Sequence, residues 1–281
     1  MPCDLAAARS EVRVLVLTGL GLNCEQETAQ GFRMCGAQAD LVHLSDMLAG
    51  LSRPLEDYQV LAMIGGFAFG DHLGGGVVYA NRLRYRMLDA LLRFVSDGGL
   101  VLGICNGFQT MVKLGLLPGL AGDYGTQTAT LAANDRLGYR NAWVTVRTEP
   151  SSPCVWTRDI DSMDLPARHG EGKFVTASEE ILDQLREQHL VALRYVDPQG
   201  EPTQQWPANP NGSPDAIAGI CDPTGRLFGL MPHPDAFLYG YNHPQWPRRK
   251  LATTLAERGD GLRIFQNGVD HAAEKLAGRT S

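Results

Sequence analysis

Apolar and polar positions along the first part of the chain predict strands and helices in turn. Residues 12–19 and 58–64 are apolar without alternation, which is typical of strands buried on both faces of a parallel sheet. Residues 40–44 form a second short strand between them. The stretch 24–35 has the pattern of a helix. Residues 12–64 are therefore predicted to form a strand, a helix and two further strands.

A glycine-rich loop separates the third strand from a long helix. Gly65 and Gly66 begin this loop, and apolar residues at near-helical spacing over 77–95 predict the helix. Residues 100–104 form the next buried strand. This βαβαβαβ order predicts an α/β fold, a doubly wound mostly parallel sheet with functional loops at the carboxyl ends of its strands.

The second half of the chain is less regular. We predict strands at residues 143–147, 174–175, 191–196, 216–221 and 226–230, and helices at 178–187 and from residue 260 onward. No internal repeat or linker composition divides the chain. We therefore expect a single domain over residues 12–277 with a small antiparallel extension, preceded by a short N-terminal extension over residues 1–11.

The composition narrows the class of protein. The chain has 25 basic and 31 acidic residues and a net charge of −6, which argues against a nucleic-acid partner because phosphate binding needs clustered Lys and Arg. Its 6 cysteines lack the close pairs of zinc sites. No segment approaches the roughly 18 apolar residues of a membrane span. We expect a cytoplasmic protein with reduced thiols, no bound metal and no membrane partner.

The segment Gly103-Ile104-Cys105-Asn106-Gly107 lies where a buried strand must turn into a helix. It has the Gly-x-nucleophile-x-Gly pattern of a nucleophile elbow, in which the glycines allow a tight turn that exposes the central side chain. The N-terminus of the following helix favours a thiolate. The alternative is a buried turn in which Cys105 only packs.

A thiol nucleophile needs a base, and the base needs a group that orients it. The segment Met231-Pro232-His233-Pro234-Asp235 follows the strand 226–230 and offers both. Because a residue before proline favours an extended conformation, we expect His233 and Asp235 to face the same side of the chain. The alternative is a proline-rich turn that carries a surface histidine.

Several motifs together resemble those of one protein family. They are Gly65–Asp71, Cys105–Gln109, His169–Phe174, Asn209–Ser213 with Ile217–Ile220, and His233–Asp235. Together, and in this order along the chain, these motifs resemble those of class I glutamine amidotransferases. Within that family they are most similar to the motifs of the glutaminase subunit of phosphoribosylformylglycinamidine synthase. The resemblance implies the flavodoxin-like amidotransferase fold over most of the chain.

The resemblance also implies roles for individual residues. Cys105 is then the nucleophile, His233 the general base and acid, and Asp235 the residue that orients His233. The backbone N–H groups of Gly66 and Asn106 form the oxyanion hole. The expected contacts to substrate come from Gly65, Phe67, Gln109 and His169.

One position departs from the family pattern. The family usually has Glu, often followed by Arg, where this chain has Asp235 and Ala236, and Asp is one methylene shorter than Glu. Its hydrogen bond to His233 then requires a closer backbone or a bridging water. Glu171 is another candidate for this role, but we prefer Asp235 because the two neighbouring prolines restrict its direction.

The activity implied by the resemblance is hydrolysis of L-glutamine to glutamate and ammonia. The ammonia would pass to a separate ATP-dependent synthetase of purine biosynthesis, with or without a small accessory subunit. The chain has no Gly-x-x-x-x-Gly-Lys-Ser/Thr loop, so ATP and Mg²⁺ are expected on the partner and no cofactor is expected in this chain.

Three other functions stay open: a glutaminase for a different synthetase, an independent cysteine hydrolase, and a non-catalytic binding module. Cys24 follows the first strand but lacks an elbow, so we interpret it as structural. Residues 209–213 are expected to form a turn held by their own side chains. The roles of residues 121–136 and 236–250 are left open, and the aromatic and basic residues of the second segment make it a candidate interface.

Overall fold

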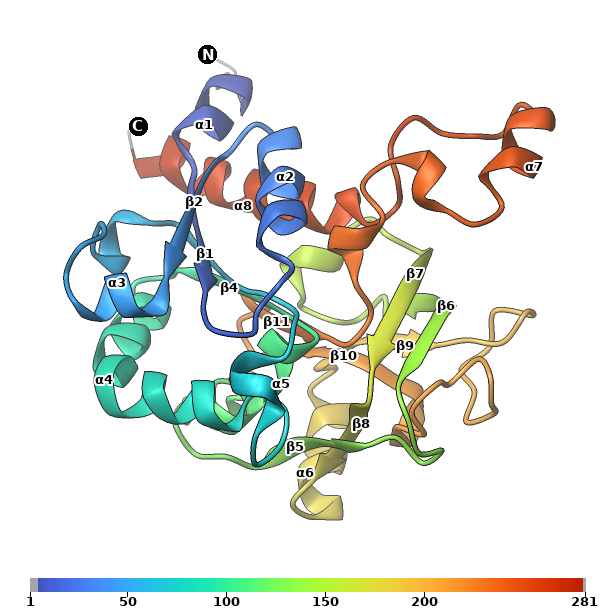
Figure 1. Cartoon of the computed structure of the whole chain (residues 1–281), viewed down its shortest axis with the longest axis horizontal. Coiled ribbons are helices and arrows are strands. Elements are labelled where there is room, and N and C mark those ends of the chain that lie inside the picture. Colours follow the sequence, from blue (N-terminus) through green and yellow to red (C-terminus); the bar gives the residue numbers. More distant parts are fainter. Residues whose placement is uncertain (1–4, 280–281) are drawn as a thin grey trace.

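A mixed sheet of nine strands forms the centre of the protein, in the order β2-β1-β3-β4-β11-β10-β9-β6-β7 (Figure 1). It is seen in a computed structural model that describes residues 5–279. Strands β2 to β11 of this order run parallel, and those from β11 to β7 run antiparallel. The nine strands are β1 Arg13–Thr18, β2 Gln38–His43, β3 Val60–Met63, β4 Leu100–Ile104, β6 Arg140–Thr148, β7 Ser162–His169, β9 Val191–Tyr195, β10 Ile217–Cys221 and β11 Leu227–Leu230.

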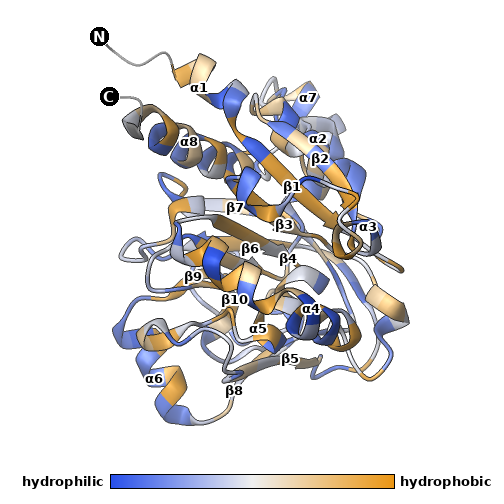
Figure 2. Cartoon of the chain, turned by 90° about the vertical axis from the view of Figure 1, so that its left-hand side faces the viewer, coloured by the Kyte–Doolittle hydropathy of each residue, from blue (hydrophilic) through white to orange (hydrophobic). Residues whose placement is uncertain are grey.

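Helices cover both faces of the parallel half of the sheet. Helices α1, α2 and α8 pack together on one face, and α4 and α5 pack together on the other (Figure 2). A second sheet of two strands, β5 Ala129–Ala133 and β8 Glu171–Thr176, lies against α5. The helices are α1 Leu5–Glu11, α2 Glu25–Met34, α3 Leu44–Leu48, α4 Val77–Ser96, α5 Asn106–Leu114, α6 Glu179–Glu187, α7 Trp246–Leu251 and α8 Leu262–Arg279. The predicted α/β fold with an antiparallel extension is confirmed.

The antiparallel extension returns to the end of the parallel strands, although its last strand is far from them in sheet order. Ala167 of β7 forms an isolated bridge with Pro232, which follows β11. The His233 N–H also donates to the Pro166 carbonyl at 2.7 Å. Strand β7 therefore lies across the carboxyl ends of the parallel strands, where the sequence predicts the functional loops.

Some elements differ from their prediction. Strand β2 begins at Gln38, before the predicted residue 40, because its pairing with β1 extends to that position. Ser178 is the N-cap of α6 as expected, but its hydroxyl makes no capping hydrogen bond. The N-terminal extension contains α1, which packs on α8 through an ion pair between Arg9 and Asp270 at 2.5 Å. Strands β5 and β7 and helices α1, α3 and α7 were not predicted.

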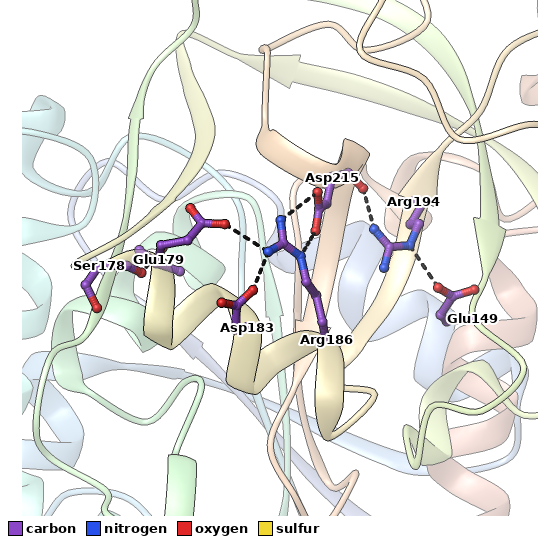
Figure 3. Close-up of polar contacts among 8 residues, drawn as sticks. Glu149, Ser178, Glu179, Asp183, Arg186, Arg194 and Asp215 are labelled. Atoms are coloured by element: carbon purple, nitrogen blue, oxygen red, sulfur yellow. Dashed lines mark hydrogen bonds and ion pairs between the residues drawn. The ribbon is translucent and has the colours of Figure 1, made fainter.

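An ion-pair network holds α6 against the antiparallel strands (Figure 3). Arg186 contacts Glu179 and Asp183 of its own helix and Asp215 of the turn before β10. Arg194 of β9 donates to the carbonyl oxygen of the same Asp215 at 2.5 Å. The network joins α6 and the neighbouring strand β9 to the turn before β10, and it lies outside the catalytic cluster described next.

Candidate active site

Cys105 lies on a sharp turn between β4 and α5. Its backbone has φ 51° and ψ −105°, a conformation that is strained for a residue with a side chain. A Cβ at Gly103 would overlap Met111, and one at Gly107 would overlap the Met63 carbonyl, so both flanking positions require glycine. This is the predicted elbow, and it directs the Cys105 thiol to the carboxyl end of the sheet, where its Sγ lies 3.6 Å from the Arg168 carbonyl oxygen of β7.

His233 lies beside Cys105 and is joined to Asp235. The His233 Nδ1 is 3.2 Å from Asp235 Oδ1 and 3.5 Å from Oδ2, and both side chains are almost completely buried. Burial lowers the pKa of His233, but the nearby Asp235 carboxylate and Cys105 outweigh it, so the pKa lies well above its ordinary value. Because Nδ1 faces Asp235, Nε2 is the nitrogen left for Cys105, and it has no hydrogen-bond partner among residues 5–279.

The route by which Asp235 reaches His233 differs from the expectation. His233 is extended, as predicted, but Pro234–Ala236 form a turn of 3-10 helix rather than a continuing extended chain. The turn brings the short carboxylate within direct contact of the ring, so a closer backbone replaces the missing methylene. Glu171, the other candidate, instead accepts a hydrogen bond from the Gly75 N–H at 2.8 Å.

The sequence predicts an oxyanion hole from the backbone N–H groups of Gly66 and Asn106, and this role stays a prediction. Neither the Gly66 N–H nor the Asn106 N–H donates a hydrogen bond to another backbone group in the described part of the chain. Gly66 has φ 140°, and a Cβ there would lie 2.6 Å from the Leu22 Cα, so only glycine fits. The geometry leaves both donors available to an oxyanion beside Cys105.

A buried network of side chains connects the elbow helix to the glycine-rich loop. Asn106 Nδ2 donates to Asp71 Oδ1 and to Gln109 Oε1, each at 2.9 Å. Gln109 Nε2 donates to the Glu171 carbonyl oxygen at 2.7 Å. Both ends of the Gln109 amide therefore have partners within the protein, and its expected contact with glutamine stays a prediction.

His169 is buried at the end of β7. Its Nδ1 lies 3.1 Å from Asn134 Oδ1, which also accepts from the Gly172 N–H. Burial, followed by the charge of His233, lowers the pKa of His169 to about 3. The ring is thus neutral near pH 7, and its Nε2 has no hydrogen-bond partner within residues 5–279. This free nitrogen is consistent with the expected substrate contact, which stays a prediction.

Aromatic and thiol side chains complete the surroundings. Phe67 is 42% exposed, and its ring centroid lies 6.1 Å from that of Tyr139. Burial raises the pKa of Tyr139, with Cys105 as the next contribution, so this residue also borders the site. Cys24 lies at the N-terminus of α2 beside His233. Sequence reasoning missed Tyr139 and the position of Cys24 because neither belongs to a motif whose spacing indicates proximity to Cys105.

Comparison with known proteins identifies the family of this chain. The model of the CobB/CobQ-like glutamine amidotransferase domain matches residues 11–272, and the chain belongs to this family. Two full-length relatives are phosphoribosylformylglycinamidine synthase subunits PurQ. That of Dehalococcoides mccartyi is 42% identical over 94% of this chain and 99% of its own length, and that of Methanococcus maripaludis is 40% identical over 92% and 97%.

Two further comparisons concern a much longer relative and a solved structure. The phosphoribosylformylglycinamidine synthase of Drosophila melanogaster is 33% identical over 86% of this chain, which corresponds to 18% of that protein. A structure of PurLQS from Thermotoga maritima has a TM-score of 0.67 at 24% identity and covers 93% of this chain and 99% of its own. At that identity the structural similarity concerns the fold.

Proposed function

We propose that this chain is the glutaminase subunit of a phosphoribosylformylglycinamidine synthase. It hydrolyses L-glutamine to glutamate and ammonia, and the ammonia serves amidine formation in purine biosynthesis. The observation that carries the proposal is the arrangement of Cys105 on a strained elbow, against His233, whose other side contacts Asp235. The PurQ relatives, similar over nearly the whole chain, support the choice of synthase.

In the first half of the reaction Cys105 attacks the side-chain amide of glutamine. His233 takes the thiol proton through Nε2, and Asp235 stabilises the resulting imidazolium at Nδ1. The Gly66 and Asn106 N–H groups stabilise the negative oxygen of the tetrahedral intermediate. His233 then gives the proton to the departing amine, which leaves as ammonia and forms a γ-glutamyl thioester.

In the second half water replaces ammonia. His233 removes a proton from the water as it attacks the thioester carbonyl, and the same two N–H groups stabilise the second oxyanion. Collapse of this intermediate returns the proton to the Cys105 sulfur and releases glutamate. We also place four other residues around the substrate. Gly65 and Phe67 lie at the rim of the glycine-rich loop, and Gln109 supports that loop. His169 contacts the substrate through its free Nε2.

The ammonia acceptor belongs to a second protein. In the Drosophila synthase the matching segment is 18% of the whole protein, which supports a division of labour between this chain and a larger ATP-dependent synthetase. ATP and Mg²⁺ would bind to that partner. The free subunit should be a poor glutaminase until it docks, and unassisted turnover equal to that of the complex would contradict this part of the proposal.

We place the reaction in the cytoplasm. No helix formed by the described residues is sufficiently long and apolar to cross a membrane. Cys24, Cys35, Cys105, Cys154 and Cys221 are free thiols, which supports a reducing compartment.

A glutamine-analogue affinity label tests the assignment of the nucleophile. The intact chain is treated with the label, digested and mapped by mass spectrometry, with Cys35→Ser as a matched control that removes another buried thiol. We expect labelling at Cys105, prevented by excess glutamine and unchanged in the control. Labelling at Cys24 alone would overturn the assignment. An independent hydrolase would cleave other amides without a partner, and a binding module would keep its activity in Cys105→Ala.

A further inference from the structure

The catalytic histidine also belongs to a group of three possible metal-ligand atoms. Cys24 Sγ, a ring nitrogen of His233 and a carboxylate oxygen of Asp235 all lie within 4.8 Å of one another. The nitrogen is Nδ1, because Nδ1 is the atom in contact with Asp235 at 3.2 Å. We propose that these three residues form a site for a thiophilic divalent cation such as Zn²⁺, and that the bound cation inhibits the enzyme.

The distances suit such a cation. Zn–N and Zn–O bonds of about 2.1 Å at a tetrahedral angle separate the two ligand atoms by about 3.4 Å. His233 Nδ1 and Asp235 Oδ1 are already 3.2 Å apart. Cys24 Sγ lies within 4.8 Å of both other atoms, and about 3.6 Å separates a sulfur and a nitrogen ligand on one Zn²⁺, so the sulfur must approach by at most about 1.2 Å. Three protein ligands and one water complete a four-coordinate site.

The present partners of these atoms are weak. Asp235 Oδ1 is buried and has no well-formed hydrogen bond within residues 5–279. Cys24 is 8% exposed, and its Sγ donates a long hydrogen bond to Asn23 Oδ1 at 3.4 Å and also interacts with the His233 ring. A cation bound to Asp235 Oδ1 would give this buried oxygen a stronger partner than its 3.2 Å contact with His233 Nδ1.

The backbone at Gly65 allows Cys24 and His233 to lie close together. A Cβ at Gly65 would lie 3.1 Å from Cys24 Sγ and 2.7 Å from His233 Cε1. Glycine at this position therefore lets both ligand side chains pack against the same stretch of backbone. Burial raises the pKa of the Cys24 thiol to about 11, so without a cation this group stays protonated near pH 7.

Cation binding would change the protonation of His233. The Cys24 thiol loses its proton to solvent. The proton that Nδ1 holds toward Asp235 moves through solvent to Nε2, and the cation takes the lone pair that this leaves on Nδ1. In the neutral imidazole the proton then resides on Nε2, the nitrogen that would otherwise accept the Cys105 proton. His233 is left without a basic nitrogen, so the cation switches off the general base. This consequence rests on the proposed function, whereas cation binding itself does not.

Titration of the full-length chain with Co²⁺ tests the site without using activity. A cobalt–thiolate bond gives an ultraviolet charge-transfer band, and four-coordinate Co²⁺ gives intense visible bands that Zn²⁺ should abolish by competition. We expect both in the wild type. Cys24→Ser should remove the charge-transfer band and weaken binding at least about tenfold, the lower range for disturbing a metal site. Cys35→Ser and Cys105→Ser should bind Co²⁺ as the wild type does.

Asp235→Asn provides a second variant in case Cys24→Ser does not fold, and circular dichroism checks the fold of each. Asp235→Asn should weaken Co²⁺ binding but keep the thiolate band. The proposal is overturned if the wild type shows no thiolate band, if Cys24→Ser binds unchanged, or if Cys105→Ser rather than Cys24→Ser loses the band. In glutaminase assays of the assembled complex, Zn²⁺ inhibition should weaken by a similar factor in Cys24→Ser.

Discussion

Adding one methyl group at Gly65 should reduce turnover without unfolding the protein. An alanine Cβ would lie 2.7 Å from His233 Cε1 and 3.1 Å from Cys24 Sγ. Carbon atoms in contact prefer about 3.7 Å, so the ring would have to retreat by about 1 Å. A displacement of that size costs about 100-fold in rate, which corresponds to about 2.7 kcal/mol of transition-state stabilisation.

The assay is glutamine hydrolysis by Gly65→Ala in the assembled complex at saturating glutamine, with thermal unfolding measured in parallel. Gly278→Ala is the control, because a Cβ at Gly278 of α8 meets no atom within 4 Å. We expect kcat to fall in Gly65→Ala alone. A Gly65→Ala enzyme with kcat within threefold of the wild type would refute the argument that Gly65 is needed to position His233.

Three further results are expected. The backbone of Cys105 is strained, with φ 51° and ψ −105°. Both Cys105→Gly and Cys105→Ala should be inactive, but in urea unfolding the glycine variant should be more stable by about 1–3 kcal/mol because glycine tolerates this conformation. A more stable alanine variant would contradict strain at the elbow. Asp235→Ala should lower kcat by about 10²–10⁴-fold and lower the pKa of His233 in the pH–rate profile, and an unchanged profile would exclude the orienting role. His169 has a folded-state pKa of about 3 against 6.5 ordinarily, so the unfolded chain binds its proton first as the pH falls. The contribution of neutral His169 to the unfolding free energy, at most about 5 kcal/mol, is therefore lost as the pH falls from about 6.5 to 3. The unfolding free energy of His169→Gln should fall less steeply with pH over this range. Equal slopes for the variant and the wild type would contradict the prediction.

The parallel half of the fold could be predicted because its signals are local. Leu100–Ile104 is a continuous apolar run that ends at a glycine-flanked cysteine, and the structure shows β4 with the same bounds. Strand β7 could not be predicted in the same way, because Pro166 and Arg168 interrupt its apolar pattern. Its position depends on pairing with β6 and on the bridge to Pro232, which are contacts between distant parts of the chain.

The candidate site shows the same limit. The residues within motifs, Cys105 and His233, were found from their local sequence, whereas their contact is made only by the fold. The turn that brings Asp235 to His233 replaces the extended path expected from the two prolines. Cys24 was interpreted as structural because it lacks an elbow, and its local sequence does not indicate that α2 begins beside His233.

The central claim is that Cys105 releases ammonia from glutamine for a synthetase. The most direct test supplies glutamine labelled with ¹⁵N in its side-chain amide to the reconstituted complex, with formylglycinamide ribonucleotide and Mg-ATP, and measures ¹⁵N in the amidine product by mass spectrometry. The account predicts labelled product with the wild type, and product from Cys105→Ala only when free ammonia is added. Labelled product formed from glutamine by Cys105→Ala would contradict it.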